Sequence, residues 1–400
     1  MNRKLIITTI NTKVVTAVFE NDSVAEIHCT DMENAKDYTL GDIYVGKIKN
    51  IVGNINAAFI EVANGVECYY SLDETAPIFT QKTGKKPYCI GDELLVQISK
   101  EAVKTKVPTV TGKLNLPGKY AVLTYGDNRI GVSSKIPKVQ REHLQTLTEP
   151  FISEEYGFII RTNAQSVSDE TICNELERLK NEYEQILNIA KTRVCFSAIK
   201  KASAAYISEL RNIYQDGLTE IIVEDDTLHQ EVQEYLKRYQ PEDLDKLRHY
   251  NDKNLPLHKL YSIEKHLLDA LKEKVWLKSG AYLVIQPTEA LTVIDVNTGK
   301  AVAKKKNDDT WLRINMEAAK EVVRQIRLRN ISGIILVDFI NMHQEKTKEV
   351  LSYLQKELKN DPIETILVDA TKLQLVEITR KKIRKPLNET FHISDLEGYI

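Results

Sequence analysis

The last third of the sequence alternates apolar runs with amphipathic stretches, and this alternation limits the fold more than any other feature. Four apolar runs enclose two stretches of helical periodicity: the runs cover 281–286, 290–297, 333–339 and 365–370, and the stretches cover 316–330 and 347–358. Such alternation is typical of βαβ units, in which successive strands lie parallel. We therefore predict a parallel sheet flanked by helices.

Three of these apolar runs carry an aspartate at or near their end: Asp295, Asp338 and Asp369. Ligands of open α/β sheets gather at the carboxyl ends of the strands, and consecutive parallel strands are often neighbours. Two carboxylates brought together there repel each other, and a hard divalent cation such as Mg²⁺ relieves the repulsion. The pattern favours a phosphoryl-transfer site. The alternative is that each aspartate closes a turn or caps a helix.

The first two-fifths of the chain consist of short runs rich in β-branched and aromatic residues, separated by glycine and asparagine turns. Many short strands of this kind indicate a barrel or sandwich, and residues 41–119 suit a five-stranded OB-type barrel. Aromatic side chains beside lysines on strands hold single-stranded nucleic acid, although the same aromatics also fill barrel cores. The residues concerned are Phe59, Tyr69, Tyr70, Lys47, Lys49 and Lys106.

The charge and cysteine content exclude some classes of protein. With 55 basic and 57 acidic residues, the chain is not a uniformly basic nucleic-acid coat, although 371–388 carries six basic residues against one acidic residue. The five cysteines form no Cys-x-x-Cys pair, which fits a reducing compartment without structural zinc. No apolar run approaches the roughly 20 residues of a membrane helix. We therefore expect a cytoplasmic protein with no membrane span.

Several long segments resemble the catalytic region of the ribonuclease E/G family: EALTVIDVNTGK (289–300), NMEAAKEVVRQIRLRNISGIILVDFINM (315–342) and TKLQLVEITRKK (371–382). Upstream, GDIYVGKIKNI and NAAFIEV resemble the start of that family's S1 domain, and GFIIRT resembles its 5′-end sensor. The resemblance runs in order along essentially all of the chain.

This resemblance implies an α+β multidomain fold. An OB-type S1 barrel (39–119) and a 5′-sensor domain (120–206) would be inserted in an RNase H-like subdomain split between 1–38 and 207–272. An α/β DNase I-like catalytic domain (273–400) would follow. The implied function is Mg²⁺-dependent endoribonuclease cleavage of single-stranded RNA in rRNA maturation and mRNA decay. The products would carry 5′-phosphate and 3′-hydroxyl ends, and Mn²⁺ would be a substitute metal.

The resemblance also assigns residues. Asp295 and Asp338 match the two metal-holding aspartates. Asn297 matches an asparagine that places the scissile phosphate or its attacking water. Arg161 and Thr162 match the pair that grips a 5′-monophosphate. The residues that match RNA contacts of the S1 domain are Phe59, Tyr69 and Lys106.

Two departures from the family pattern alter these expectations. Ser134 stands where many relatives have an arginine in the sensor, so the loss of a guanidinium weakens the expected dependence on a 5′-monophosphate, and Lys135 offers only a point charge. The sequence also lacks the Cys-x-x-Cys pair of the zinc link that joins protomers in relatives. We therefore expect no zinc-linked dimer, while a homo-oligomer stays open.

Two other functions compete with the nuclease. A non-catalytic RNA-binding or ribosome-assembly protein would need only the barrel and the basic segment. A metal-dependent phosphatase or nucleotide enzyme would use the same α/β sheet without the barrel. The paired aspartates disfavour the first function, because two adjacent carboxylates repel each other and destabilise the fold unless a metal binds between them. The barrel disfavours the second function.

Overall fold

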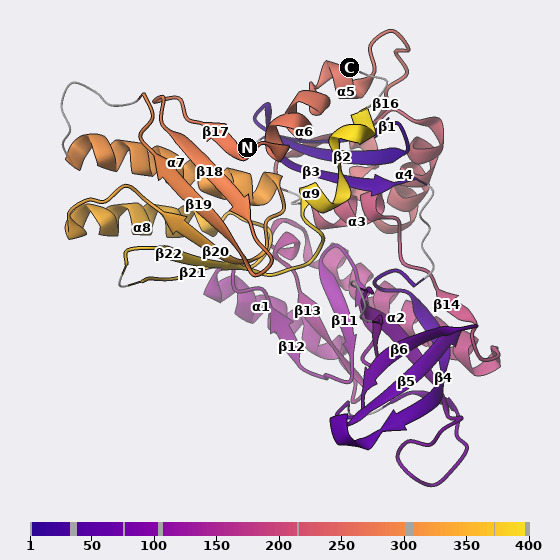
Figure 1. Cartoon of the computed structure of the whole chain (residues 1–400). Coiled ribbons are helices and arrows are strands. Elements are labelled where there is room, and N and C mark those ends of the chain that lie inside the picture. The colour runs from indigo at the N-terminus through magenta and orange to yellow at the C-terminus, as the bar shows by residue number, and fades with distance from the viewer. Residues whose placement is uncertain are drawn as a thin grey trace. The chain divides into compact units, whose positions relative to one another are not determined.

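The computed structural model describes residues 2–32, 38–74, 77–102, 107–213, 216–300, 308–371 and 373–396. The chain forms two compact units, one of residues 1–33 with 217–400 and the other of 34–216. The chain therefore leaves the first unit after its third strand and returns to it near Gly217 (Figure 1). No helix among the described residues is both long enough and apolar enough to cross a membrane.

The second unit begins with a closed barrel of five strands. In sheet order these are β4 (Ile43–Val52), β5 (Ala57–Ala63), β6 (Val66–Ser71), β9 (Thr109–Thr111) and β8 (Glu93–Lys100). Pairing of β4 with β8 closes the barrel, while β7 (Phe79–Gln81) and β14 (Ala198–Lys200) extend β8 and β4. The barrel expected from the short β runs is confirmed, because inward residues such as Ile60, Tyr70 and Val96 are fully buried.

A four-stranded sheet and three helices complete the described part of the second unit. The strands, in sheet order, are β10 (Asn115–Pro117), β11 (Ala121–Tyr125), β13 (Tyr156–Ile160) and β12 (Ile130–Val132). The helices α1 (Lys138–Thr148) and α2 (Asp169–Thr192) contact this sheet, and α3 (Ala205–Asn212) follows β14. Ser168 caps the N-terminus of α2, because its hydroxyl accepts the backbone N–H of Thr171, and the helix buries one apolar face against β11.

The first unit contains a five-stranded sheet built from both ends of its sequence. The order is β16 (Leu247–His249), β15 (Leu218–Val223), β1 (Arg3–Ile10), β2 (Lys13–Glu20) and β3 (Ser23–Asp31). The central strands are apolar on both faces, which matches their burial. Four helices accompany this sheet: α4 (Asp226–Tyr239), α5 (Leu257–Leu260), α6 (Ile263–Leu271) and α9 (Leu387–Thr390).

The second sheet of this unit has six strands. Its order is β17 (Lys274–Trp276), β18 (Tyr282–Pro287), β19 (Leu291–Asn297), β20 (Gly333–Asp338), β22 (Val376–Arg380) and β21 (Thr365–Ala370). Only β19 and β20 pair in parallel, and every other pairing in this sheet is antiparallel. The prediction of a parallel sheet was therefore wrong beyond this one βαβ unit. The short turn from β21 to β22 permits only an antiparallel hairpin, and β22 inserts between β20 and β21.

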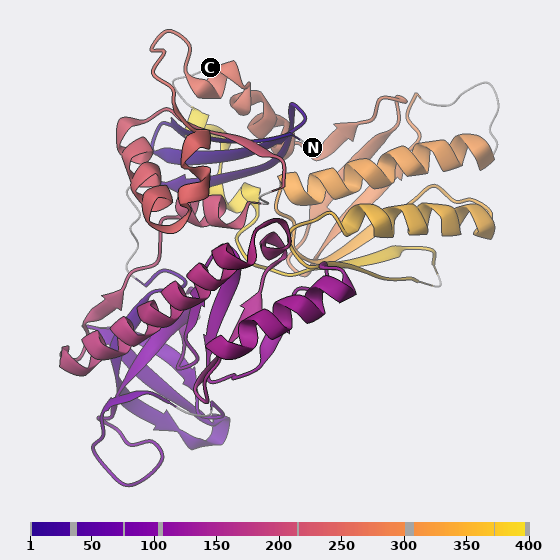
Figure 2. The ribbon, with the colours of Figure 1, turned by 180° about the vertical axis from the view of Figure 1, so that it is seen from behind.

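Helices α7 (Asp308–Leu328) and α8 (Gln344–Leu358) both cover one face of the six-stranded sheet, as Figure 2 shows from behind. Along β19 the residues facing these helices, such as Ile294 and Val296, are buried. The alternate residues, Val293, Asp295 and Asn297, are half-buried on the other face. In the described part of the first unit, that second face carries no helix (Figure 1); we call it the open face.

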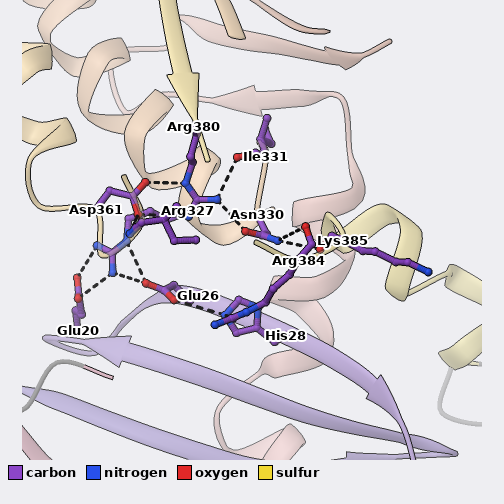
Figure 3. Close-up of polar contacts among 11 residues, drawn as sticks. Glu20, Glu26, His28, Arg327, Asn330, Ile331, Asp361, Arg380, Arg384 and Lys385 are labelled. Atoms are coloured by element: carbon purple, nitrogen blue, oxygen red, sulfur yellow. Dashed lines mark hydrogen bonds and ion pairs between the residues drawn. The ribbon is translucent and has the colours of Figure 1, made fainter. Parts of the chain in front are cut away.

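Partly buried ion pairs connect α7 to the five-stranded sheet of the first unit (Figure 3). The guanidinium of Arg327, on α7, donates to Glu20 on β2 at 3.0 Å and to Glu26 on β3 at 2.8 Å. Burial alone would raise the pKa of Glu26, but the hydrogen bond with His28 and the charge of Arg327 outweigh burial and hold this pKa well below its usual range. The last turn of α7 is thereby fixed to β2 and β3.

Candidate catalytic site

The site is built on β19 and β20, the parallel strand pair of the six-stranded sheet. Asp295 on β19 and Asp338 on β20 are directly opposed partners in the parallel register. Neighbouring strands lie about 4.8 Å apart, and residues in register point to the same face of the sheet. The structure thus brings together two of the three aspartates that the strand-end pattern singled out, and it places both on the open face.

Asn297 lies two residues after Asp295 and shares its face, because side chains alternate along a strand. Its Nδ2 donates to the Asp295 carboxylate (Oδ2) at 2.6 Å. The amide therefore orients one carboxylate of the pair.

The charge of this pair is uncompensated among the described residues. Neither Asp295 nor Asp338 forms an ion pair with a described residue, and the Asp338 carboxylate, which is exposed, has no hydrogen-bond partner there either. No group of three or more His, Cys, Asp or Glu side chains in the described ranges could hold a metal ion. Two carboxylates with open positions suit Mg²⁺, which keeps several waters and is commonly held by one or two carboxylates and substrate phosphates.

Asp369 does not belong to this site. It lies on β21, opposite Glu377 of β22, so an entire strand separates it from Asp338. Its Oδ1 accepts the backbone N–H of the adjacent Ala370 at 2.7 Å. Asp369 therefore fits the alternative interpretation, in which a strand-end aspartate closes a turn.

The barrel residues with expected RNA contacts fall into three groups. Phe59 on β5 and Tyr69 on β6 are cross-strand partners with half-exposed rings, 6.5 Å apart and nearly perpendicular. Tyr70 is fully buried and belongs to the barrel core, so the core interpretation holds for it. Lys106 lies outside the described residues.

The expected sensor residues follow β13. The Arg161 guanidinium donates to the backbone oxygen of Gly118 and to Oδ1 of Asn212, both at 2.7 Å. The Thr162 hydroxyl lies 2.9 Å from the Ser133 hydroxyl. The neighbouring Ser134 and Lys135 are both exposed. These groups meet at one end of the four-stranded sheet, since β12 and β13 pair in parallel.

A comparison with protein families identifies the chain. The model of the ribonuclease E/G family matches residues 115–383, a range that includes Arg161, Asp295 and Asp338. The chain belongs to the ribonuclease E/G family. The matched range does not extend to Phe59 or Tyr69.

Curated relatives match over more of the chain. Ribonuclease G of Salmonella typhimurium is 31% identical over 398 residues, which cover 96% of this chain and 81% of the relative. Ribonuclease G of Escherichia coli is 30% identical over 400 residues, with coverages of 97% and 81%. Ribonuclease E of Nostoc sp. is 32% identical over 390 residues, which are 94% of this chain and 56% of the relative.

One residue that positions the site of this ribonuclease E/G family member, Asn315, was missed by the sequence patterns. Asn315, fully buried on α7, donates through Nδ2 to the backbone oxygen of Ile340 at 2.7 Å and accepts the Ile340 N–H at 3.1 Å. This pair of bonds fixes the segment that directly follows Asp338. An asparagine on the apolar face of a helix was the available signal, because such an amide needs buried partners.

Gly299 shapes the turn after Asn297 in a similar way. Its φ of +53° lies in the left-handed region. A Cβ at this position would lie 2.5 Å from the backbone oxygen of Gly280 and 3.0 Å from the ring of Tyr282. Only glycine fits here without moving the turn, so the backbone after Asn297 packs directly against β18.

Proposed function

We propose that this endoribonuclease uses Mg²⁺, held by Asp295 and Asp338, to cleave single-stranded RNA into products with 5′-phosphate and 3′-hydroxyl ends. We further propose that it serves rRNA maturation and mRNA decay. The observation that carries the proposal is the direct register of Asp295 with Asp338 on one face, beside the amide of Asn297. Membership of the ribonuclease E/G family supports RNA as the substrate.

The residues of the chain divide the work. When bound, Mg²⁺ supplies positive charge that lowers the pKa of water and offsets the charge of the phosphate. Asp295 and Asp338 provide the anionic oxygens for the cation, and Asn297 fixes the orientation of Asp295. The second hydrogen of the Asn297 amide would donate to the reacting phosphate or water. No side-chain nucleophile is needed, because water attacks phosphorus in line and the 3′ oxygen leaves.

The barrel supplies binding in this proposal. Phe59 and Tyr69 present half-exposed ring surface on adjacent strands. Because every base has a face that stacks on an aromatic ring, such a pair holds single strands with little sequence preference. Lys106 would add a phosphate contact, as the family resemblance implies.

The decisive experiment incubates a labelled single-stranded RNA with the full chain in Mg²⁺, in Mn²⁺ and in EDTA. We expect cleavage with either cation and none in EDTA, and ligation or phosphatase treatment of the fragments should reveal 5′-phosphate ends. Binding without cleavage under all three conditions would favour the non-catalytic RNA-binding protein. Cleavage in EDTA would overturn the metal assignment alone.

Arg161→Ala should reduce any preference for 5′-monophosphorylated over 5′-hydroxyl RNA. A charge-assisted hydrogen bond to phosphate contributes about 1.5–3 kcal/mol, so we expect the ratio of the two kcat/KM values to fall about tenfold or more. Arg129→Ala is the matched control, because its guanidinium is exposed and paired with Asp127. An unchanged ratio in Arg161→Ala, with a wild-type enzyme that discriminates, would exclude Arg161 from the sensor. Equal cleavage of the two substrates by the wild type would show that the sensor, which has Ser134 where many relatives have an arginine, does not discriminate.

A further inference from the structure

An aromatic pair with a lysine lies on the open face, two strands from the proposed metal-binding aspartates; Trp276 is exposed and Tyr282 is half-buried. The rings of Trp276 on β17 and Tyr282 on β18 are 5.1 Å apart. The Lys274 ammonium lies 4.3 Å from the centre of the Trp276 ring and 3.6 Å from that of Tyr282. Trp276 is 57% exposed, although burying a tryptophan is strongly favourable. We call these three residues the aromatic platform.

The sheet register places this platform in line with the catalytic residues. Trp276 is opposite Tyr282, and Tyr282 is opposite Asn297. In the adjacent row, Lys274 is opposite Val284, which is opposite Asp295. Trp276 and Asn297 therefore lie in the same cross-strand row, separated by two strand spacings of about 4.8 Å each. The platform and the aspartates share one face of one rigid sheet.

The side chains of the platform do not serve the core. Val275, between Lys274 and Trp276, points to the opposite face and packs on the hydrophobic core of the sheet. Tyr282 is held from beneath by the backbone of Gly299, where a Cβ would lie 3.0 Å from the ring. One ring is thus fixed against the turn that carries Asn297, while the other is left to solvent.

We propose that Trp276 and Tyr282, with Lys274, form a base-stacking subsite for an unpaired nucleotide adjoining the scissile phosphate. The inference deepens the proposed function and rests on it. An aromatic face stacks on any base, and an ammonium beside it neutralises a phosphate. A β-ribbon with such a face holds the strand while the metal-binding pair meets the phosphate. This subsite is separate from Phe59 and Tyr69, which belong to the barrel.

Binding is tested without cleavage. The protein used is the whole chain with two substitutions. Asp338→Asn prevents turnover, and Trp311→Phe leaves Trp276 as the only tryptophan. A single-stranded RNA oligonucleotide is titrated into this variant. We expect Trp276 fluorescence to be quenched, and an RNA with abasic positions beside the cleavage site to quench less. Absence of quenching with an RNA that binds by filter retention would overturn the subsite.

Kinetics provides the second measurement. Removing one base–aromatic stack lowers binding by roughly five- to hundredfold, so Trp276→Leu should raise KM by that factor with less change in kcat. Trp276→Phe should retain most of the wild-type affinity. Lys274→Ala should weaken RNA binding, because it removes the charge that neutralises a phosphate. Ile366→Ala is the matched control, because Ile366 is exposed at the far edge of the same sheet.

The outcomes separate this inference from the proposed function. A wild type that cleaves, with Trp276→Leu at wild-type KM and no quenching, overturns the subsite and leaves the nuclease intact. A wild type that does not cleave, yet shows base-dependent quenching, overturns the nuclease and leaves the subsite. A KM increase in Trp276→Leu that persists equally on the abasic RNA would also overturn stacking, because no base remains to stack.

Discussion

Asp338→Asn is expected to reduce RNA cleavage about a thousandfold or more while RNA affinity stays within a few-fold of the wild type. Asparagine keeps the size of aspartate but removes the negative charge that holds a divalent cation. A metal contributes several kcal/mol of transition-state stabilisation, and each 1.36 kcal/mol is a factor of ten in rate. Asp295→Asn should have a similar effect, and in addition it disturbs the bond from Asn297.

The chain provides a matched control for this prediction. Asp369→Asn makes the same chemical change at the end of another strand of the same sheet, but β22 separates this residue from the pair. We expect near wild-type cleavage from it. Single-turnover cleavage at saturating Mg²⁺ is the measurement, with RNA binding measured in EDTA. Loss of activity in Asp369→Asn equal to that in Asp338→Asn would contradict the two-aspartate site.

The sequence predicted that Asp295 and Asp338 lie together, because the signals for this pairing are local. An apolar run that ends in aspartate identifies both a strand and its polar end, and one helix between two such runs implies a parallel pair. The position of Asp369 was not predictable in this way. It depends on where β22 inserts, and the basic composition of the longer segment 375–386 concealed an interior strand.

The register of the platform and the partners of Asn315 were also beyond sequence patterns. Trp276 and Asn297 are far apart along the chain, and their alignment arises from two successive antiparallel pairings. The same holds for Arg161, whose partners Gly118 and Asn212 come from distant segments. Periodicity reports which face a residue occupies, but it does not report which residue of another strand lies opposite.

Arg380→Ala should destabilise the first unit by about 3–5 kcal/mol, because removing one partner of a buried ion pair leaves the other charge without compensation. The Arg380 and Asp361 side chains are 2% and 0% exposed, and Nε donates to the Asp361 carboxylate at 2.7 Å. The same guanidinium donates to Asn330 and to the backbone oxygen of Ile331 (Figure 3). It thereby anchors β22 to the segment that leads into β20.

Urea unfolding followed by tryptophan fluorescence measures this effect, since Trp276 and Trp311 both belong to the first unit. Lys381→Ala, the exposed neighbour, is the control and should change stability by less than about 0.5 kcal/mol. A double variant, Arg380→Met with Asp361→Leu, should lose less than Arg380→Ala, because it removes both charges together. If the double variant were the less stable, the hydrogen bonds that Asp361 accepts from Ile363 and Thr365 would outweigh the ion pair as the source of stability.

Because β22 pairs with β20, an Arg380→Ala enzyme that remains folded should also show reduced cleavage, since Asp338 would be displaced.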